Sequence, residues 1–210
     1  MNTTATPRRR PARARILAAA EELFYSHGTA ATGIDTVTEH AKVARRSLYN
    51  NFASKDELIT AWLEQRHADW LAFYTARRDA ATDTTTGTDT TGTTVTTTTS
   101  TTHPALAVFD AYLDHAASSG EGFRGCGLLN TAAEYPVNSP VRTIVRRHKE
   151  EVEQLLTADA PEDAELLSYL LEGAVTRSGL EGTLTRLHRA RDMASAVLAA
   201  RQADTRQAGK

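Results

Sequence analysis

The first third of this 210-residue chain alternates short helical segments with tight turns, and this pattern constrains the fold more than any other feature. The first segment starts near Arg13 and ends near Gly28, and its apolar residues recur at helical spacing: Ile16, Leu17, Ala20, Leu23 and Phe24. Thr32, with Asp35 three residues later, predicts the N-cap of a short second helix that continues to about His40.

A tight turn and two further helices complete this region. Residues 41–43 (Ala-Lys-Val) form the turn, and residues 44–52 (Ala-Arg-Arg-Ser-Leu-Tyr-Asn-Asn-Phe) predict a third helix. Ser54 and Glu57 have the spacing of a capping box, in which each side chain bonds the backbone N–H of the other residue. A long fourth helix therefore begins here and continues through Leu58, Ile59 and Trp62. The whole region predicts a helix-turn-helix with a supporting helix on each side.

These residues resemble the DNA-binding segment of TetR/AcrR-type transcriptional regulators. Residues 41–52, followed by Ser-Lys-Asp-Glu-Leu at 54–58, are similar in register to the recognition-helix signature of that family. Glu-Leu-Phe at 22–24, with Gly28 four residues on, is similar to the end of the family's first helix. The resemblance covers about the first third of the chain. It implies an N-terminal DNA-binding domain and a C-terminal helical domain that binds a small molecule and forms dimers.

Two residues depart from the family pattern. Lys42 stands in the turn where the family usually has glycine, so a positive φ at this position would strain the backbone. Ala44 stands where an N-capping serine or threonine is common, so the third helix is expected to begin less firmly. Neither change removes a group that would contact DNA.

A helix placed in the major groove presents its polar side chains to base edges and phosphates. Arginine suits guanine O6 and N7, and asparagine suits adenine N6 and N7. This chemistry and the resemblance together predict DNA contacts from seven residues: Thr32, Arg45, Arg46, Ser47, Tyr49, Asn50 and Lys55. Leu48 and Phe52 are expected in the core. The alternative for each polar residue is an ordinary solvent-facing side chain.

Charge is spread unevenly, although the net charge is only −2. Residues 1–66 contain 10 Lys and Arg against 7 Asp and Glu, and the remainder contains 14 against 19. A basic end on an otherwise acidic chain suits a nucleic-acid-binding module. Residues 1–12 include three consecutive arginines and are expected to form a disordered basic arm.

The segment between Thr82 and Thr102 is unusual because fifteen of its 21 residues are threonine. It cannot bury enough apolar surface to offset the entropy of ordering, so we expect a flexible insertion.

Helical periodicity resumes after it, and no strand-like alternation occurs, so the sequence predicts an all-α fold. The expected domains are a helix-turn-helix DNA-binding domain at 13–53 and a helical ligand-binding and dimerisation domain at 54–210.

A single helix-turn-helix makes few base contacts, so useful specificity requires two half-sites read by a symmetric dimer. We therefore expect a homodimer on a near-palindromic double-stranded DNA operator. The last two predicted helices are apolar over a wide face, and the expected interface residues are Leu167, Leu170, Leu171, Ala174, Ala194, Val197 and Leu198. The alternative is that these residues are core of a single chain.

The resemblance also implies a small-molecule effector whose binding releases the protein from DNA, so that the chain would act as a ligand-released repressor. Candidate ligand-binding residues are aromatic and polar positions of the predicted C-terminal helices: Trp70, Phe73, Phe109, Tyr112, Cys126, Asn130, His148 and Tyr169. Aromatic residues at helical spacing are also what ordinary cores contain, which is the alternative for each of them. The sequence does not define the effector.

Cys126 is the single cysteine, which excludes an intramolecular disulfide and suits a reducing cytoplasm. Two roles are open for it: a redox or electrophile sensor, or a small packing residue.

The chain lacks CxxC, HExxH, GxSxG and phosphate-loop motifs, so we expect no enzyme activity, cofactor or metal. No window approaches 18 apolar residues, so no membrane span is expected. A helical adaptor without specific DNA binding is the remaining alternative.

Overall fold

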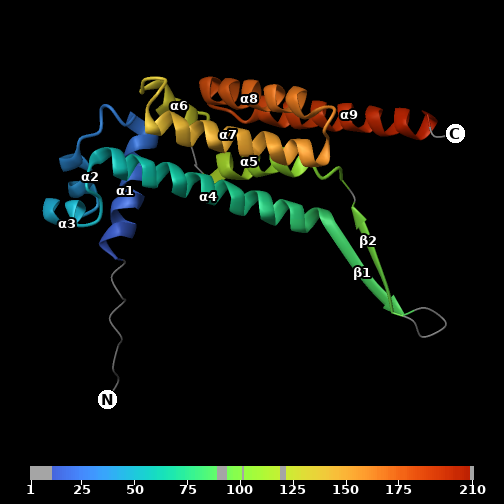
Figure 1. Ribbon diagram of the computed structural model, residues 1–210, viewed down its shortest axis with the longest axis horizontal. Helices are drawn as coiled ribbons and strands as arrows, with labels where there is room; N and C mark the ends of the chain where they lie inside the picture. Colours follow the sequence, from blue (N-terminus) through green and yellow to red (C-terminus); the bar gives the residue numbers. More distant parts are fainter. Residues whose placement is uncertain (1–10, 89–93, 101, 119–121, 209–210) are drawn as a thin grey trace, which may run out of the picture. The chain divides into compact units, whose positions relative to one another are not determined.

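The computed structural model describes residues 11–88, 94–100, 102–118 and 122–208, and its architecture is helical (Figure 1). The helices in this described part are α1 (Ala12–His27), α2 (Ile34–His40), α3 (Arg45–Tyr49), α4 (Lys55–Ala81), α5 (Leu106–Ser118), α6 (Gly127–Ala133), α7 (Pro140–Asp159), α8 (Ala164–Glu181) and α9 (Thr185–Ala208). The expected all-α class is confirmed. The expected basic arm at 1–12 lies outside the described residues except for its last two.

The threonine-rich segment contains the two strands that occur among the described residues. Strands β1 (Thr82–Thr88) and β2 (Thr94–Ser100) pair antiparallel, with Thr82 opposite Ser100 and Thr88 opposite Thr94. The sequence predicted a flexible insertion with no strand-like alternation, whereas residues 82–88 and 94–100 pair as strands. β-branched threonine favours extended backbone, and pairing satisfies backbone hydrogen bonds without requiring an apolar face.

The chain divides into two compact units. Unit 1 contains the residues before Arg66 together with Gly127–Val145, and unit 2 contains Arg66–Cys126 and the residues from Arg146 onward. This division differs from the expected domains at 13–53 and 54–210. The difference arises because α6 and the start of α7 group with the helix-turn-helix segments.

The core of unit 1 is built from the apolar positions that the helical periodicity identifies. The side chains of Ile16, Phe24, Val37, Leu48 and Phe52 are all at most 2% exposed. Trp62 of α4 is also buried, and its ring meets the edge of Phe24 with centroids 5.3 Å apart. The indole N–H of Trp62 donates to the carboxylate of Glu21 at 2.6 Å, so this buried donor is satisfied.

Within unit 1, Glu134 fastens the end of α6 to the loop that follows α1. Its carboxylate accepts hydrogen bonds from the Ala30 N–H at 2.6 Å, the Thr29 N–H at 3.2 Å and the Thr29 hydroxyl at 2.6 Å. Gly28 has a left-handed φ of 85°, and a Cβ there would lie 2.7 Å from a Glu134 oxygen. Glycine is therefore needed for both the backbone conformation and the close approach. We call these three hydrogen bonds the Glu134 clamp.

The predicted helix starts agree with the structure at α4 and differ at α2. The Glu57 N–H donates to the Ser54 hydroxyl at 3.1 Å, and the Glu57 carboxylate accepts from the Ala53 N–H at 2.6 Å, which confirms the capping box. At α2, however, the N-cap is Gly33, with no side-chain cap. The predicted capping by Thr32 was wrong.

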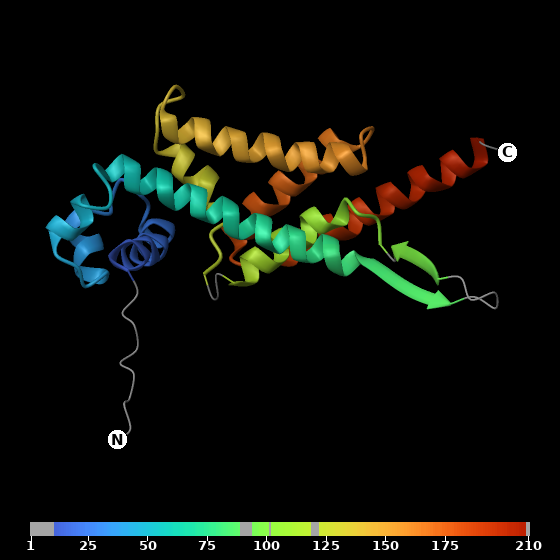
Figure 2. The same ribbon diagram turned by 60° about the horizontal axis from the view of Figure 1, so that its bottom comes forward.

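The core of unit 2 lies where α5 and α8 pack against α9 (Figure 2). Ion pairs reinforce this packing, since Arg191 of α9 bonds both carboxylate oxygens of Asp110 of α5, at 2.7 and 3.2 Å. Gly179 of α8 lies directly against the backbone at Gly125, where an added Cβ would stand 2.3 Å from the Gly125 nitrogen. Only glycine at this position lets the preceding loop approach the helix so closely.

Five of the seven predicted dimer-interface residues belong to this core instead. Leu167, Leu171, Ala174, Ala194 and Leu198 are at most 8% exposed within a single chain. Leu170 and Val197 are half-buried. The prediction assigned the inward face of α8 and α9 to dimerisation, because helical periodicity locates an apolar stripe without telling which partner covers it. The large exposed apolar side chains of these helices are Leu166, Tyr169, Leu180 and Met193.

Candidate nucleic-acid interface

The turn between α2 and α3 is tight and contains a strained residue. The N–H groups of Lys42 and Val43 donate to the carbonyls of Glu39 and Thr38, each at 3.0 Å, and the Lys42 carbonyl accepts from the Arg15 guanidinium at 2.9 Å. Lys42 has a φ of 53°, the one positive φ among the described non-glycine residues. The condition under which Lys42 was expected to strain the turn is therefore met, because its φ is positive.

Helix α3 is short and begins without a side-chain cap. It runs from Arg45 to Tyr49, with Ala44 as N-cap and no side-chain hydrogen bond there, as the absence of serine or threonine predicts. The Phe52 N–H still donates to the Leu48 carbonyl at 2.9 Å, so helix-like bonding continues past the last helical residue. Backbone hydrogen bonds and core packing therefore hold this helix in place.

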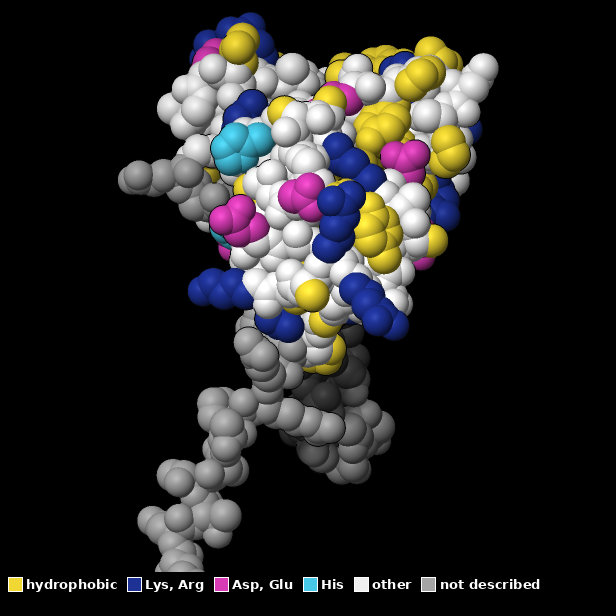
Figure 3. Space-filling model, turned by 90° about the vertical axis from the view of Figure 1, so that its left-hand side faces the viewer, with side chains coloured by type: hydrophobic (Ala, Val, Ile, Leu, Met, Phe, Trp, Pro, Cys, Tyr) yellow, Lys and Arg dark blue, Asp and Glu magenta, His cyan; other side chains and the backbone are white. Residues whose placement is uncertain are grey.

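The two faces of α3 have opposite character. Leu48 points into the core of unit 1 and is fully buried, whereas Arg45, Arg46 and Asn50 are exposed and Tyr49 is 44% exposed. Figure 3 shows the side of the molecule that carries α1, α2 and α3, where Lys and Arg side chains lie among neutral and acidic ones. The exposed edge of α3 thus presents two cations, an amide and a phenol to solvent.

Arg45 is held in position before any ligand arrives. Its Nη1 donates to both carboxylate oxygens of Asp35, at 2.9 and 3.2 Å, and its guanidinium carbon stands 5.8 Å from the centre of the Tyr49 ring. Hydrogen bonding with Tyr49 and the charge of Asp35 raise the pKa of Arg45, whose side chain is exposed. Since the pair with Asp35 lies at the surface, a phosphate or a base edge competes with it readily.

The other predicted contact residues divide by exposure. Thr32 is 3% exposed and its hydroxyl donates to the Gly28 carbonyl at 2.7 Å, so this hydroxyl is already engaged within the chain and its contact with DNA stays a prediction. Ser47 and Lys55 are half-buried. The hydroxyl of Thr32 satisfies a carbonyl at the end of α1, a use that the sequence does not reveal because it depends on how the loop folds back.

The predicted effector residues lie in several places. Trp70, Phe109, Tyr112 and His148 are buried in unit 2, and Phe73 and Cys126 are partly buried against the same core. Asn130 belongs to unit 1, and Tyr169 is 67% exposed with its hydroxyl donating to Glu165 at 2.6 Å. The structure thus brings the first six to one core and does not bring Asn130 or Tyr169 to it.

Unit 2 also contains a chain of polar side chains around Tyr112 that sequence reasoning mostly missed. Lys149 donates to the Tyr112 hydroxyl at 3.0 Å and to Glu172 of α8 at 2.6 Å. His148 Nε2 lies 3.4 Å from the same hydroxyl. The sequence shows a lysine directly after His148 on α7. It does not show that Glu172 is the partner of this lysine, because that contact depends on how α8 packs against α7.

The other end of this chain is a pair of histidines. His67 Nδ1 lies 2.5 Å from His148 Nδ1, and His67 Nε2 lies 2.8 Å from Glu151. One assignment of protons satisfies all of these contacts: His148 donates to His67, His67 donates to Glu151, and the Tyr112 hydroxyl donates to His148. We call this set the buried polar chain: Glu151, His67, His148, Tyr112, Lys149 and Glu172.

Burial and neighbouring charge set the protonation of the buried polar chain. Burial, followed by the nearby Lys149 ammonium, lowers the pKa of His148 to about 2, so this imidazole is neutral near pH 7. Burial also raises the pKa of Tyr112 above its usual range. Burial disfavours the Lys149 ammonium, but nearby negative charge, including the carboxylate of Glu172, outweighs burial and raises its pKa well above the usual value.

The short helix α3 has a buried apolar face and an exposed basic edge, and it belongs to a helix-turn-helix in a chain that also contains a larger helical unit. These features are typical of a DNA-binding transcriptional regulator. Residues 16–62 match the model of the bacterial regulatory proteins of the tetR family. Residues 16–62 are therefore similar to the DNA-binding segment of that family, which supports the TetR/AcrR resemblance of the sequence. None of the helices in the described ranges is both long and apolar enough to cross a membrane.

Individual relatives agree with this assignment. FasR, an HTH-type transcriptional activator from Mycolicibacterium smegmatis, is 28% identical over 166 residues, which cover 79% of this chain and 68% of that protein. TtgR, an HTH-type transcriptional regulator from Pseudomonas putida, is 42% identical over 55 residues, or 26% of each chain. The crystal structure of SCO4454, a TetR-family transcriptional regulator from Streptomyces coelicolor, has a TM-score of 0.65 at 28% identity and covers 88% of this chain and 96% of that one. All three relatives are described as transcriptional activators or regulators.

Proposed function

We propose that this chain is a sequence-specific DNA-binding regulator that acts as a homodimer on a near-palindromic operator and is released by a small molecule. The observation that supports DNA reading is the exposed edge of α3, where Arg45, Arg46, Tyr49 and Asn50 face solvent while Leu48 anchors the helix. Arg45 suits guanine and Asn50 suits adenine. Tyr49, Ser47 and Lys55 are suited to phosphate oxygens.

The test is binding to the DNA upstream of the chain's own coding region, followed by fluorescence anisotropy at a fixed, moderate salt concentration. Arg45→Ala should weaken specific binding by about 1–3 kcal/mol if the guanidinium reads a base. Arg146→Ala is the matched control, because Arg146 is an exposed arginine of unit 2 that pairs with Glu150 in an i,i+4 contact of 3.6 Å. Equal affinity of the operator fragment and a scrambled fragment would leave the adaptor alternative in place.

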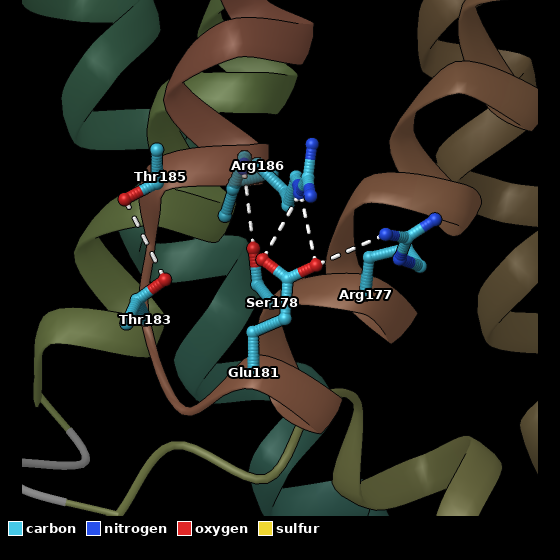
Figure 4. Close-up of polar contacts among 7 residues, drawn as sticks. Arg177, Ser178, Glu181, Thr183, Thr185 and Arg186 are labelled. Atoms are coloured by element: carbon cyan, nitrogen blue, oxygen red, sulfur yellow. Dashed lines mark hydrogen bonds and ion pairs between the residues drawn. The ribbon is translucent and has the colours of Figure 1, made fainter.

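Dimerisation through the outer face of α8 and α9 is proposed from a groove between them. This groove measures about 490 Å³ and is lined by Tyr169, Leu170, Gly173, Ala174, Arg177, Arg186, Arg189, Ala190 and Met193. Two of its arginines are fixed by one carboxylate, since Glu181 accepts from Arg177 at 3.1 Å and from Arg186 at 3.0 Å (Figure 4). An exposed apolar groove with ordered arginines at its rim suits a second copy of the same surface.

Substitution with glutamate tests this face. Met193→Glu places a charge in the groove, at a side chain that is 52% exposed, and should convert the dimer to monomer as measured by light scattering coupled to size exclusion. Leu180→Glu is the control, because Leu180 is also apolar, is 82% exposed and is not among the residues that line the groove. A dimer that persists in Met193→Glu, or is lost equally in Leu180→Glu, argues against this interface.

The proposed regulatory mode is repression, because a dimer bound at a promoter blocks polymerase. In one conformer of the dimer the two recognition helices no longer fit successive major grooves. An effector that binds this conformer more tightly than the DNA-binding conformer weakens operator binding. FasR is named an activator, so a reporter gene driven by the operator is needed to distinguish repression from activation. Deleting the gene should raise reporter expression, and a fall would assign activation instead.

A further inference from the structure

Unit 2 contains polar atoms whose hydrogen-bonding capacity is not used within the described residues. The indole N–H of Trp70 is buried, with the side chain 1% exposed, and has no acceptor there. Glu172 Oε2 is likewise buried and has no donor, although Oε1 of the same carboxylate accepts from Lys149. The Lys149 ammonium has three protons and two hydrogen-bond acceptors, Tyr112 and Glu172. Unsatisfied buried polar groups are rare in native structures and call for a physical reason.

These atoms belong to one contiguous cluster. The rings of Trp70 and Tyr112 have centroids 5.3 Å apart, and Lys149 reaches both the Tyr112 hydroxyl, at 3.0 Å, and Glu172, at 2.6 Å. Four helices of unit 2 contribute to it: α4 supplies Trp70, α5 supplies Tyr112, α7 supplies Lys149 and α8 supplies Glu172. A molecule bound here would contact all of these helices at once.

The surroundings are aromatic on one side and open to solvent on the other. The indole of Trp70 stacks on the ring of Tyr74, with centroids 5.8 Å apart and an interplanar angle of 14°. The side chains of Lys149 and Glu172 keep 19% and 28% of their surface exposed. The cluster therefore reaches the surface at its charged edge, and the buried indole lies behind it.

The unused groups comprise two donors and one acceptor, and a hydroxyl is their complement because it has two lone pairs and one proton. A carboxylate would bring its charge against Glu172, and a hydrocarbon would leave all three groups unpaired. We propose that this cluster binds a hydroxylated aromatic molecule, a phenol, whose oxygen accepts from Trp70 and Lys149 and whose proton is donated to Glu172. The inference rests on the proposed function, since it names the chemical class of the effector.

The test compares ligands that differ in one group, by isothermal titration calorimetry on the full chain without DNA. 4-Ethylphenol should bind at least about tenfold more tightly than its methyl ether 4-ethylanisole, which cannot donate to Glu172. 4-Ethylbenzoate should bind more weakly than the phenol, because its carboxylate faces Glu172. Equal binding of phenol and ether, absence of binding, or tighter binding of the benzoate would overturn the proposal.

A pair of tryptophan variants tests the site itself. Trp70→Phe keeps an aromatic ring and removes the N–H, so it should weaken 4-ethylphenol binding about fivefold to tenfold. Trp62→Phe is the matched control, because that indole already donates to Glu21 in unit 1, and it should leave ligand affinity unchanged. Equal effects of the two substitutions would exclude Trp70 as a ligand contact.

Should Trp70→Phe fail to fold, the ligand series on the parent chain still decides the matter. Because these titrations contain no DNA, a chain that binds the phenol but no operator refutes the proposed function alone. A chain that binds its operator but shows no preference for the hydroxyl refutes the effector class alone.

Discussion

Replacing Glu134 with alanine removes all three hydrogen bonds of the Glu134 clamp, two from backbone N–H groups and one from the Thr29 hydroxyl. Hydrogen bonds to a charged group contribute about 1.5–3 kcal/mol each when shielded from water. Glu134 is exposed, so water competes for the carboxylate, and we expect Glu134→Ala to lower the free energy of unfolding by about 2 kcal/mol in total. Operator affinity should fall as well, because the clamp fixes the loop that leads into α2.

Glu134→Gln separates the contributions within the clamp. The amide oxygen of glutamine can take the place of Oε2, which accepts from the Ala30 N–H and the Thr29 hydroxyl, both at 2.6 Å. Its NH₂ group then meets the Thr29 N–H, so that two donors face each other where Oε1 accepted at 3.2 Å. We expect an intermediate loss of about 1 kcal/mol for this variant.

Urea unfolding measured by tryptophan fluorescence provides the assay. The chain has two tryptophans, so a Trp70→Phe background leaves Trp62 of unit 1 as the reporter. Glu150→Ala serves as control, because Glu150 is an exposed glutamate of unit 2 in a surface ion pair, and it should change stability by less than about 0.5 kcal/mol. If Glu134→Ala is as mild as this control, the clamp does not hold unit 1 together and the reasoning is refuted.

Three other predictions concern the turn, the third helix and acid stability. Lys42→Gly should raise the free energy of unfolding by up to about 1 kcal/mol, because relief of left-handed strain exceeds the entropy cost of glycine; Lys42→Val, measured in the same urea titrations, should lower it. Ala44→Ser supplies the missing N-cap of α3 and should add about 1 kcal/mol in thermal or urea unfolding, and no gain would show that the serine does not cap. Burial and then Lys149 lower the pKa of His148 to about 2, from an ordinary 6.5. Below pH 6.5 the unfolded chain therefore takes up a proton that the folded chain refuses, so stability should fall by up to about 1.4 kcal/mol per pH unit between pH 6 and pH 4. His148→Gln should flatten this part of the pH profile, and an unchanged slope would contradict the assignment.

The helix-turn-helix was predictable because its signals are local. The capping box at Ser54 and Glu57 depends on residues within a few positions of each other and is found as expected. Strain at Lys42 was expected only if its φ were positive, and the structure has a φ of 53° there. Thr32 misled the same reasoning. Threonine before an acidic residue favours an N-cap, but folding of the loop turned its hydroxyl toward the Gly28 carbonyl and left Gly33 at the helix start.

Features that depend on tertiary packing were not predictable in this way. Periodicity identified the apolar stripes of α8 and α9, but their inward residues, such as Leu167 and Leu198, are covered by the same chain. The contact between Lys149 and Glu172 joins α7 to α8, so no spacing within either helix announces it. The strands of the threonine-rich hairpin lacked the alternating apolar face by which a strand is normally recognised.

The contact between Gly179 and the backbone at Gly125 limits how this sequence can evolve. Any side chain at 179 would have to displace a neighbouring main chain, which cannot yield by changing rotamer as a side chain does. A descendant that loses this glycine therefore has to remodel the 124–126 loop in the same step. Position 179 and this loop, which are distant in the sequence, are expected to change together. Descendants that keep the loop but diversify position 179 would show that the main chain can give way there after all.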